Sequence, residues 1–302
     1  MTGQNSGIVV ETVVECGNHL GESPLWCPES QTLFWINCDP DPALFRLDPA
    51  SGAVSSWPMP NRIGAVALHD GSRVLVALRD GAYLFDLASA SFAPVAANPL
   101  GTDGDLHEGK CDRQGRFWTG SISRAAPGLA GFYRLDDGLI RVFDDISVAN
   151  SLAWSPDGRT LYHGDTMQAT VWASDYDIDT GEAGPVRPFL RIPAEDGMID
   201  GAAVDAVGNF WLALFQGACI RCYDPAGMLL RQIDLPMSQP TMAAFGGPDM
   251  ADLYITSTRH GKNARELNAE PDLGNLFRIR GIGQGLAETA WMPPAIRAAF
   301  RR

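Results

Sequence analysis

The chain has 302 residues, of which 45% are hydrophobic, and its 36 acidic and 23 basic residues give a net charge of −13. Nucleic acids and anionic membranes repel such a chain, so we expect neither as a partner. No apolar run reaches the roughly 18 residues of a membrane span, and residues 1–16 lack the basic and apolar parts of a signal peptide. We therefore expect a cytoplasmic protein with a sizeable core.

The predicted elements begin with one alternating apolar strand at residues 7–15, which has no counterpart later in the chain. A short apolar and aromatic strand then recurs six times, 41 to 49 residues apart, at residues 32–37, 73–78, 116–121, 160–165, 209–214 and 252–257. Turns rich in Pro, Asp, Asn and Gly precede four copies, and a strand with a polar hairpin follows each copy. Units of about 40 to 50 residues with four strands are typical of propeller blades.

The repeats predict an all-β fold in which residues 1–302 form a single six-bladed β-propeller domain. The unmatched strand at residues 7–15 is expected to close the ring by pairing with strands near the C-terminus. Residues 257–275 form the longest irregular stretch, for which we expect a surface loop or a short helix. Cys219 and Cys222 form a C-x-x-C pair without a second pair or a nearby histidine, which favours two small buried residues over a zinc or redox site.

Superposing the repeats aligns four polar residues at the entrance of the strand that lines the central channel of each blade. The words "ESPLW", "HEGKC", "NSLAW" and "DGAAV" place these residues at equivalent positions, Glu22, His107, Asn150 and Asp200. Blades two and six offer no equivalent, since Ile63 or Gly64 and Thr241 stand there. Taken singly, such residues are solvated strand ends, turn residues or structural histidines. Taken as four equivalent positions around one axis, they predict a site for a divalent cation.

Two carboxylates in this set roughly neutralise one divalent cation, so we expect a single metal ion, with calcium, zinc, manganese, magnesium and iron all left open. Asp196 is a competing candidate because it precedes "GMID". It lies four residues upstream of the aligned position, however, and the spacing to "VDAVGNFW" favours Asp200.

At these residues the sequence resembles the gluconolactonase, regucalcin and senescence-marker-protein family. The matching words are "LGESPLW" (20–26), "GKCDRQGRFWTG" (109–120), "ANSLAWSPDGRTLYHGDT" (149–166) and "DGAAVDAVGNFWLA" (200–213). The resemblance covers nearly the whole chain. It implies a six-bladed propeller that hydrolyses sugar lactones with one divalent metal in the channel, held by Glu22, Asn150 and Asp200.

The chain departs from this family just before the inner strand of blade three. The family reads Arg-x-Asn-Asp-Gly-Lys there, and its Arg and Asn contact substrate, whereas this chain reads Asp105-Leu106-His107-Glu108-Gly109-Lys110. A family acid after the next strand is also replaced, since Ser121 and Ser123 occupy that region. The resemblance therefore implies a changed substrate pocket, with His107, Asp105 and Glu108 as its candidate substrate-binding residues.

The sequence-based hypothesis is a metal-dependent lactonase that opens a small sugar (aldono) lactone to the aldonate. Asp200 is expected to act as a metal ligand and as the general base that activates water. Two alternatives stay open: hydrolysis of other esters or organophosphates at the same centre, and a non-catalytic metal-binding propeller with a regulatory role. For His107, substrate contact is favoured over direct metal ligation and over a purely structural role, because the family's Asn at this position contacts substrate.

Overall fold

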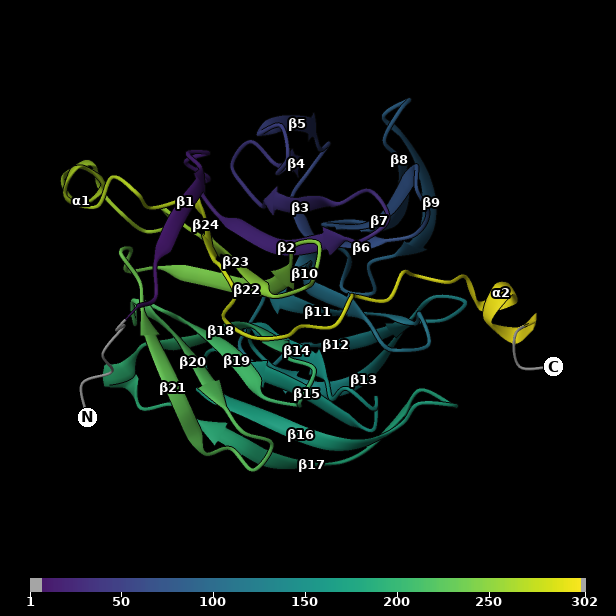
Figure 1. The fold of residues 1–302 in the computed structure, drawn as a ribbon. Helices are drawn as coiled ribbons and strands as arrows, with labels where there is room; N and C mark the ends of the chain where they lie inside the picture. The colour runs from purple at the N-terminus through teal and green to yellow at the C-terminus, as the bar shows by residue number, and fades with distance from the viewer. Residues whose placement is uncertain (1–6, 300–302) are drawn as a thin grey trace.

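A computed structural model describes residues 7–299 and shows six four-stranded antiparallel sheets arranged around a central axis (Figure 1). This confirms the predicted six-bladed propeller. The innermost strands of the blades are β2, β6, β10, β14, β18 and β22, and each of them packs against the innermost strands of its two neighbours, which closes the ring.

Five blades are continuous in sequence, each running from its innermost to its outermost strand. The first comprises β2 (Gly21–Cys27), β3 (Thr32–Asn37), β4 (Ala43–Asp48) and β5 (Ala53–Pro58). The second comprises β6 (Ile63–Leu68), β7 (Arg73–Leu78), β8 (Gly81–Asp86) and β9 (Ser91–Ala97). The third comprises β10 (Gly104–Cys111), β11 (Phe117–Ser123), β12 (Ala130–Leu135) and β13 (Leu139–Ile146). The fourth comprises β14 (Ala149–Trp154), β15 (Thr160–Asp165), β16 (Thr170–Asp177) and β17 (Glu182–Arg191). The fifth comprises β18 (Met198–Val204), β19 (Phe210–Phe215), β20 (Cys219–Tyr223) and β21 (Leu229–Asp234).

The sixth blade joins both ends of the chain. It contains β22 (Pro240–Gly246), β23 (Asp252–Ser257), β24 (Leu276–Ile279) and, outermost, β1 (Val10–Val14). β1 pairs antiparallel with β24, with Val10 opposite Ile279. The predicted closure by the N-terminal strand is therefore confirmed, and the ring is held by main-chain hydrogen bonds between segments far apart in sequence.

Short helices occur only outside the blades in the described part of the chain. They are α1 (Ala264–Ala269), α2 (Pro294–Ala299) and the 3₁₀ turns η1 (Gly101–Asp103) and η2 (Ala194–Asp196). α1 begins with a capping box, in which the Asn263 side chain accepts from the Glu266 amide and the Glu266 side chain accepts from the Asn263 amide. This is the short helix expected within residues 257–275. No described helix has the length and apolar character needed to cross a membrane.

The hydrophobic core is divided into six layers, one between each pair of adjacent blades. The recurring aromatic residues fill these layers, and Trp35, Trp118 and Tyr254 are fully buried. Cys219 and Cys222 are free thiols buried in β20, as expected for two small core residues. Because each blade buries both faces against neighbours, the positions of the inner strand ends are fixed by the whole ring.

A C-terminal segment, residues 284–292, crosses one end of the ring on its way to α2 (Figure 1). We call it the strap. Its main chain binds blade five where Ala206 donates to Gln284, blade two where Trp291 donates to Leu68, and blade three where Met292 donates to Gly115. These contacts lie where the inner strands end, so the strap covers the end of the channel opposite to the strand entrances.

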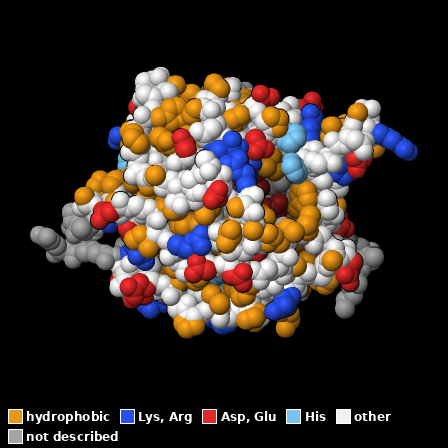
Figure 2. Space-filling model, turned by 180° about the vertical axis from the view of Figure 1, so that it is seen from behind, with side chains coloured by type: hydrophobic (Ala, Val, Ile, Leu, Met, Phe, Trp, Pro, Cys, Tyr) orange, Lys and Arg blue, Asp and Glu red, His pale blue; other side chains and the backbone are white. Residues whose placement is uncertain are grey.

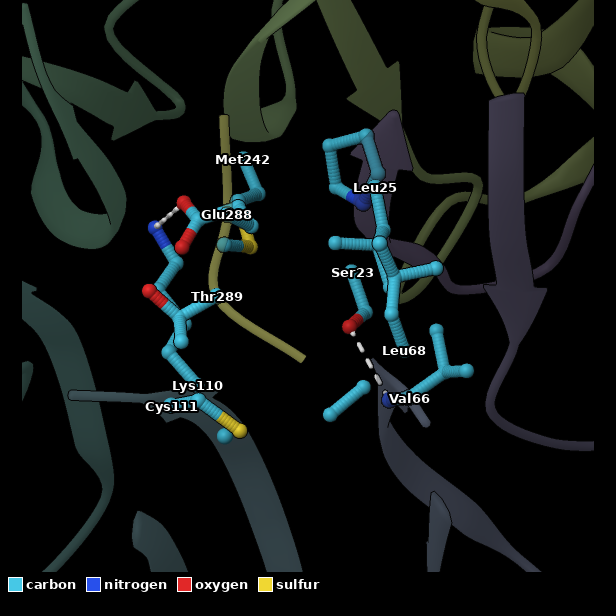
Figure 3. Close-up of a pocket in the computed structure, with 12 residues that line it drawn as sticks. Ser23, Leu25, Val66, Leu68, Lys110, Cys111, Met242, Glu288 and Thr289 are labelled. Carbon is cyan, nitrogen blue, oxygen red and sulfur yellow. Dashed lines mark hydrogen bonds and ion pairs between the residues drawn. The ribbon is translucent and has the colours of Figure 1, made fainter. Parts of the chain in front are cut away.

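Inside the channel beside the strap, Lys110 extends from β10 towards Glu288, with 3.9 Å between its ammonium nitrogen and the carboxylate oxygen (Figure 3). Its ammonium group also donates to the Ala202 carbonyl at 2.5 Å. Across this small pocket the Ser23 hydroxyl accepts from the Val66 amide. Polar contacts and apolar side chains thus fill this end of the channel.

Candidate metal centre and active site

The innermost strands carry an irregularity at the same level in every blade. In each of the six, the register with the next strand shifts where the aligned residue stands, as between Glu22 and Leu25, between Asn150 and Ala153, and between Ile199 and Ala202. Such bulges redirect side chains and are frequent beside active sites. Their repetition around the ring explains how polar residues from different blades come to share one level of the channel.

The bulge in β10 places two consecutive residues in the site. Neighbouring residues of a regular strand point to opposite faces, but the register of β10 shifts between His107 and Gly109, and Glu108 has a φ of 43°. Ser23 and Ser151, the residues equivalent to Glu108 in blades one and four, also have positive φ, at 51° and 63°. Glu108 therefore joins the channel carboxylates, and its Oε1 accepts from the Leu152 amide of blade four at 2.9 Å.

Three acidic side chains from three blades are buried together. Glu22, Glu108 and Asp200 have exposed fractions of 6%, 4% and 8%. Burial raises the pKa of Glu22 to about 7 and that of Glu108 to about 8. Burial, and then the charges of Glu22 and Glu108, raise the pKa of Asp200 well above its usual value. The three carboxyl groups therefore repel one another when ionised.

This repulsion is the property that a divalent cation would relieve. Glu108 Oε2 is buried and has no hydrogen-bond partner within the described structure, so one carboxylate oxygen stands free for a ligand. Among residues 7–299, no three His, Cys, Asp or Glu side chains are placed to hold a metal ion by themselves, and this includes the three acids Glu22, Glu108 and Asp200. The expected set contains only two such residues, Glu22 and Asp200, and its third member is the amide of Asn150. A donor set of carboxylate and amide oxygens fits a hard cation.

Asn150 lies at the same level with its amide group fixed. It is 4% exposed, and its Nδ2 donates to the Thr166 hydroxyl at 2.8 Å. Thr166 in turn donates to the Ile199 carbonyl beside Asp200. The aligned residues Glu22, His107, Asn150 and Asp200 are thus all buried at the bulges of their strands, where superposition of the repeats put them.

His107 is buried among polar groups that the sequence did not reveal. Arg62 of the segment before β6 donates to His107 Nδ1 at 3.3 Å and forms an ion pair with Asp39 at 2.5 Å. Burial, followed by the charge of Arg62, lowers the pKa of His107 to about 3, while a hydrogen bond with the Asn150 side chain opposes the shift. The imidazole is therefore neutral at pH 7. The only sequence signal for Arg62 is a cation one position before Ile63, at the entrance of an inner strand.

Asp105 stands nearer the mouth of the channel. Its carboxylate accepts from Arg79 at 2.7 Å and lies 3.7 Å from Arg124. Asp105 stands where the family resemblance noted in the sequence leads one to expect an arginine. In this chain, Arg79 and Arg124 bring basic side chains to that position instead. The face seen in Figure 2 is hollowed near its centre, with acidic side chains inside and basic and histidine side chains at the rim.

Asp196, the competing candidate, lies outside this cluster. It belongs to η2 and forms an ion pair with Arg221 at 2.9 Å, which lowers the pKa of its carboxyl group. Its side chain is 32% exposed, whereas Asp200 is buried beside Glu22 and Glu108. The choice of Asp200 over Asp196 therefore agrees with the geometry.

Comparison with known proteins identifies the family to which this propeller belongs. The family model described as the SMP-30/gluconolactonase/LRE-like region matches residues 20–259. The chain belongs to this family. Members of the family hydrolyse sugar lactones, and the expected enzyme class, a lactonase, is confirmed.

Individual relatives extend over nearly the whole chain. It is 36% identical to a 6-deoxy-6-sulfogluconolactonase of Pseudomonas putida, with 92% of this chain and 97% of that protein covered. It is 32% identical to an L-arabinolactonase of Azospirillum brasilense, covering 91% and 94%. A solved structure, a calcium-binding regucalcin of Agrobacterium tumefaciens, superposes with a TM-score of 0.91 at 29% identity, covering 94% and 98%.

Proposed function

We propose that this lactonase opens a small sugar lactone with the help of one divalent cation held by Glu22, Asn150 and Asp200. The observation that carries the proposal is the convergence of three buried carboxyl groups and a fixed amide at one level of the channel. The names of the relatives, a sulfogluconolactonase and an L-arabinolactonase, support a lactone of a five- or six-carbon sugar acid. The calcium-binding name of the solved regucalcin supports the cation.

The reaction adds water across the ester bond of the ring. The water oxygen forms a new bond to the carbonyl carbon, the bond from that carbon to the ring oxygen breaks, and the ring oxygen leaves as a hydroxyl after taking up a proton. A cation bound in the channel would polarise the carbonyl group and lower the pKa of a coordinated water.

The protein's own groups supply proton transfer and orientation. Asp200 is proposed to accept the proton of the attacking water, because a positioned carboxylate within reach acts as a general base. A cation held beside Asp200 would offset the repulsion of Glu22 and Glu108 and favour the ionised carboxylate, which is the form that acts as a base. Glu108, Asp105 and His107 line the same end of the channel and are the candidates for contact with, or orientation of, the sugar.

The deciding experiment is a hydrolysis assay with a panel of aldonolactones, carboxylic esters and organophosphates. Protein stripped with a chelator should be inactive on all of them, and adding back calcium, manganese, magnesium or zinc one at a time should restore activity on lactones. Full activity after stripping would contradict the metal requirement. Activity confined to organophosphates or other esters would favour the esterase alternative, and cation binding without hydrolysis would favour a regulatory propeller.

A further inference from the structure

Two sets of directed hydrogen bonds lie at the site. Arg62 donates to Asp39 and to His107, and Asn150 donates to Thr166, which in turn donates to the Ile199 main chain. Arg62, His107 and Asn150 have exposed fractions of only 7%, 5% and 4%. These three side chains therefore depend on their protein neighbours rather than on water for hydrogen bonds, and the chemistry of the groups fixes the direction of each bond.

Arg62 fixes the tautomer of His107. A guanidinium group has only donors, so the bond from Arg62 Nη2 to His107 Nδ1 requires that Nδ1 accept. A neutral imidazole carries one proton, which must then be on Nε2. Asp39 holds the guanidinium in place through its ion pair with Nη1. In this state His107 has no lone pair left for a metal ion.

Thr166 fixes the amide of Asn150 from the other side. The Thr166 hydroxyl has one proton, which it donates to the Ile199 carbonyl at 3.0 Å. It must therefore accept from Asn150, which assigns Nδ2 to this side of the amide at 2.8 Å. Asn150 Oδ1 is therefore on the side of the amide that faces away from Thr166.

We infer that Arg62 is a positioning residue for the proposed cation site, because it holds the His107 imidazole in the tautomer that offers no free lone pair to the cation and so keeps His107 out of the ligand set. The inference rests on the cation in the proposed function. It makes the ligand set all oxygen, from Glu22, Asn150 and Asp200. Such a set suits calcium, magnesium or manganese, whereas a free imidazole nitrogen would favour zinc. This chain has a histidine where the family has an asparagine, and Arg62 prevents that histidine from changing the metal.

The test measures tautomer and metal preference directly, in the full-length protein without substrate. Nitrogen-15 spectra of histidine-labelled protein, with the His107 signals assigned from a His107→Asn sample, should show the Nε2–H tautomer. Calorimetry on chelator-stripped protein gives the affinities for calcium and zinc. Arg62→Met should abolish the tautomer bias and raise the zinc-to-calcium affinity ratio by about tenfold or more, the size usual for partners of metal ligands.

Two further variants separate this role from a structural one. The zinc gain of Arg62→Met should disappear in the double variant Arg62→Met/His107→Asn, because the nitrogen that would bind zinc is gone. Arg187→Met, which removes an arginine from an exposed ion pair with Asp175 on the fourth blade, should leave tautomer and affinities as in the wild type.

An Nδ1–H tautomer in the wild type would overturn the inference, as would a folded Arg62→Met protein with an unchanged affinity ratio. The tautomer measurement needs no variant, so it decides even if Arg62→Met fails to fold. A protein that shows the expected tautomer and cation preference but hydrolyses no lactone would contradict the proposed function alone.

Discussion

At the scale of single residues, the site depends on burying acids from different blades in one place. Glu22, Glu108 and Asp200 come from strands that are far apart in sequence, and each pKa is raised chiefly by loss of water. The folded ring holds the carboxyl groups together despite their repulsion. The repulsion between these carboxyl groups therefore lowers the stability of the folded protein at the place where a cation would bind. Two substitutions at single residues test the site.

Asp200→Asn should leave a folded protein that hydrolyses lactones very slowly. Loss of a positioned general base typically lowers kcat by about 10²- to 10⁴-fold, and loss of a ligand charge adds a weaker affinity for the cation. Steady-state kinetics at saturating metal, with thermal unfolding as a check on folding, measure both effects. Asp196→Asn is the matched control and should keep near-normal turnover. The opposite result for the two variants would show that the fifth blade has been aligned wrongly.

Glu108→Gln should stabilise the metal-free protein and weaken its binding of calcium. An amide keeps an acceptor for the Leu152 amide while removing one of the three repelling charges. We expect a gain of about 1 kcal/mol in unfolding free energy at pH 8, which corresponds to roughly 1 to 2 °C in Tm for a chain of 302 residues. Differential scanning calorimetry with chelator and with calcium measures the two states. A Tm that falls in chelator would mean that repulsion does not govern this cluster.

At the scale of secondary-structure elements, the second strand of blade four carries another buried histidine that the site does not use. His163 of β15 is stacked between Phe143 at 4.0 Å and Trp172 at 5.6 Å, measured between ring centroids. Both of its ring nitrogens lack a hydrogen-bond partner in the described structure, and burial lowers its pKa to about 3. This imidazole serves as an aromatic packing group between blades three and four.

His163 should make the protein sensitive to acid. Its folded pKa lies below the unfolded value of about 6.5, so protons bind the unfolded state more tightly. The stability it contributes is complete above pH 6.5 and is lost as pH falls towards 3. Urea unfolding should show that His163→Phe loses about 2 to 3 kcal/mol less than the wild type between pH 7 and pH 4.5. His260→Phe, at an exposed histidine, is the control, and parallel curves for His163→Phe and wild type would contradict the expectation.

The repeat pattern predicted most of the elements because each blade repeats the same inner and aromatic strands. The same repetition located Glu22, His107, Asn150 and Asp200, since equivalent positions in a ring share one level. The repeat pattern did not predict the bulges. The bulge in β10 points Glu108 into the channel beside His107, although neighbouring residues of a regular strand point to opposite faces. The pattern also passed over Arg62, because blade two has no acid or amide at the aligned position to draw attention to that strand entrance.

At the scale of the whole molecule, two segments outside the repeats complete the ring. β1 supplies the outermost strand of the sixth blade, and its alternating pattern made this pairing predictable. The strap has no such pattern. Residues 284–292 form neither a strand nor a helix, and main-chain hydrogen bonds hold them to blades two, three, five and six. Its course across the channel therefore follows from tertiary contacts alone.

The strap should support stability without taking part in the reaction, because it crosses the end of the channel opposite to the acidic cluster. Trp291 is its anchor: it is 4% exposed in the layer between blades two and three, its amide donates to Leu68 at 2.6 Å, and its carbonyl accepts from His69. Trp291→Ala should cost about 3 to 5 kcal/mol of unfolding free energy, as is usual for a buried aromatic side chain.

Below its lowered Tm, the Trp291→Ala protein should keep kcat and KM within about twofold of the wild type, since residues that are far apart and share no partners influence one another little. Trp291→Phe, which keeps most of the packing, should lose less stability and serves as the matched control. Chemical unfolding and lactone kinetics at 15 °C measure the two properties on the same samples. If turnover fell while the unfolding free energy stayed unchanged, the strap would belong to the catalytic machinery, and the channel would function from both ends.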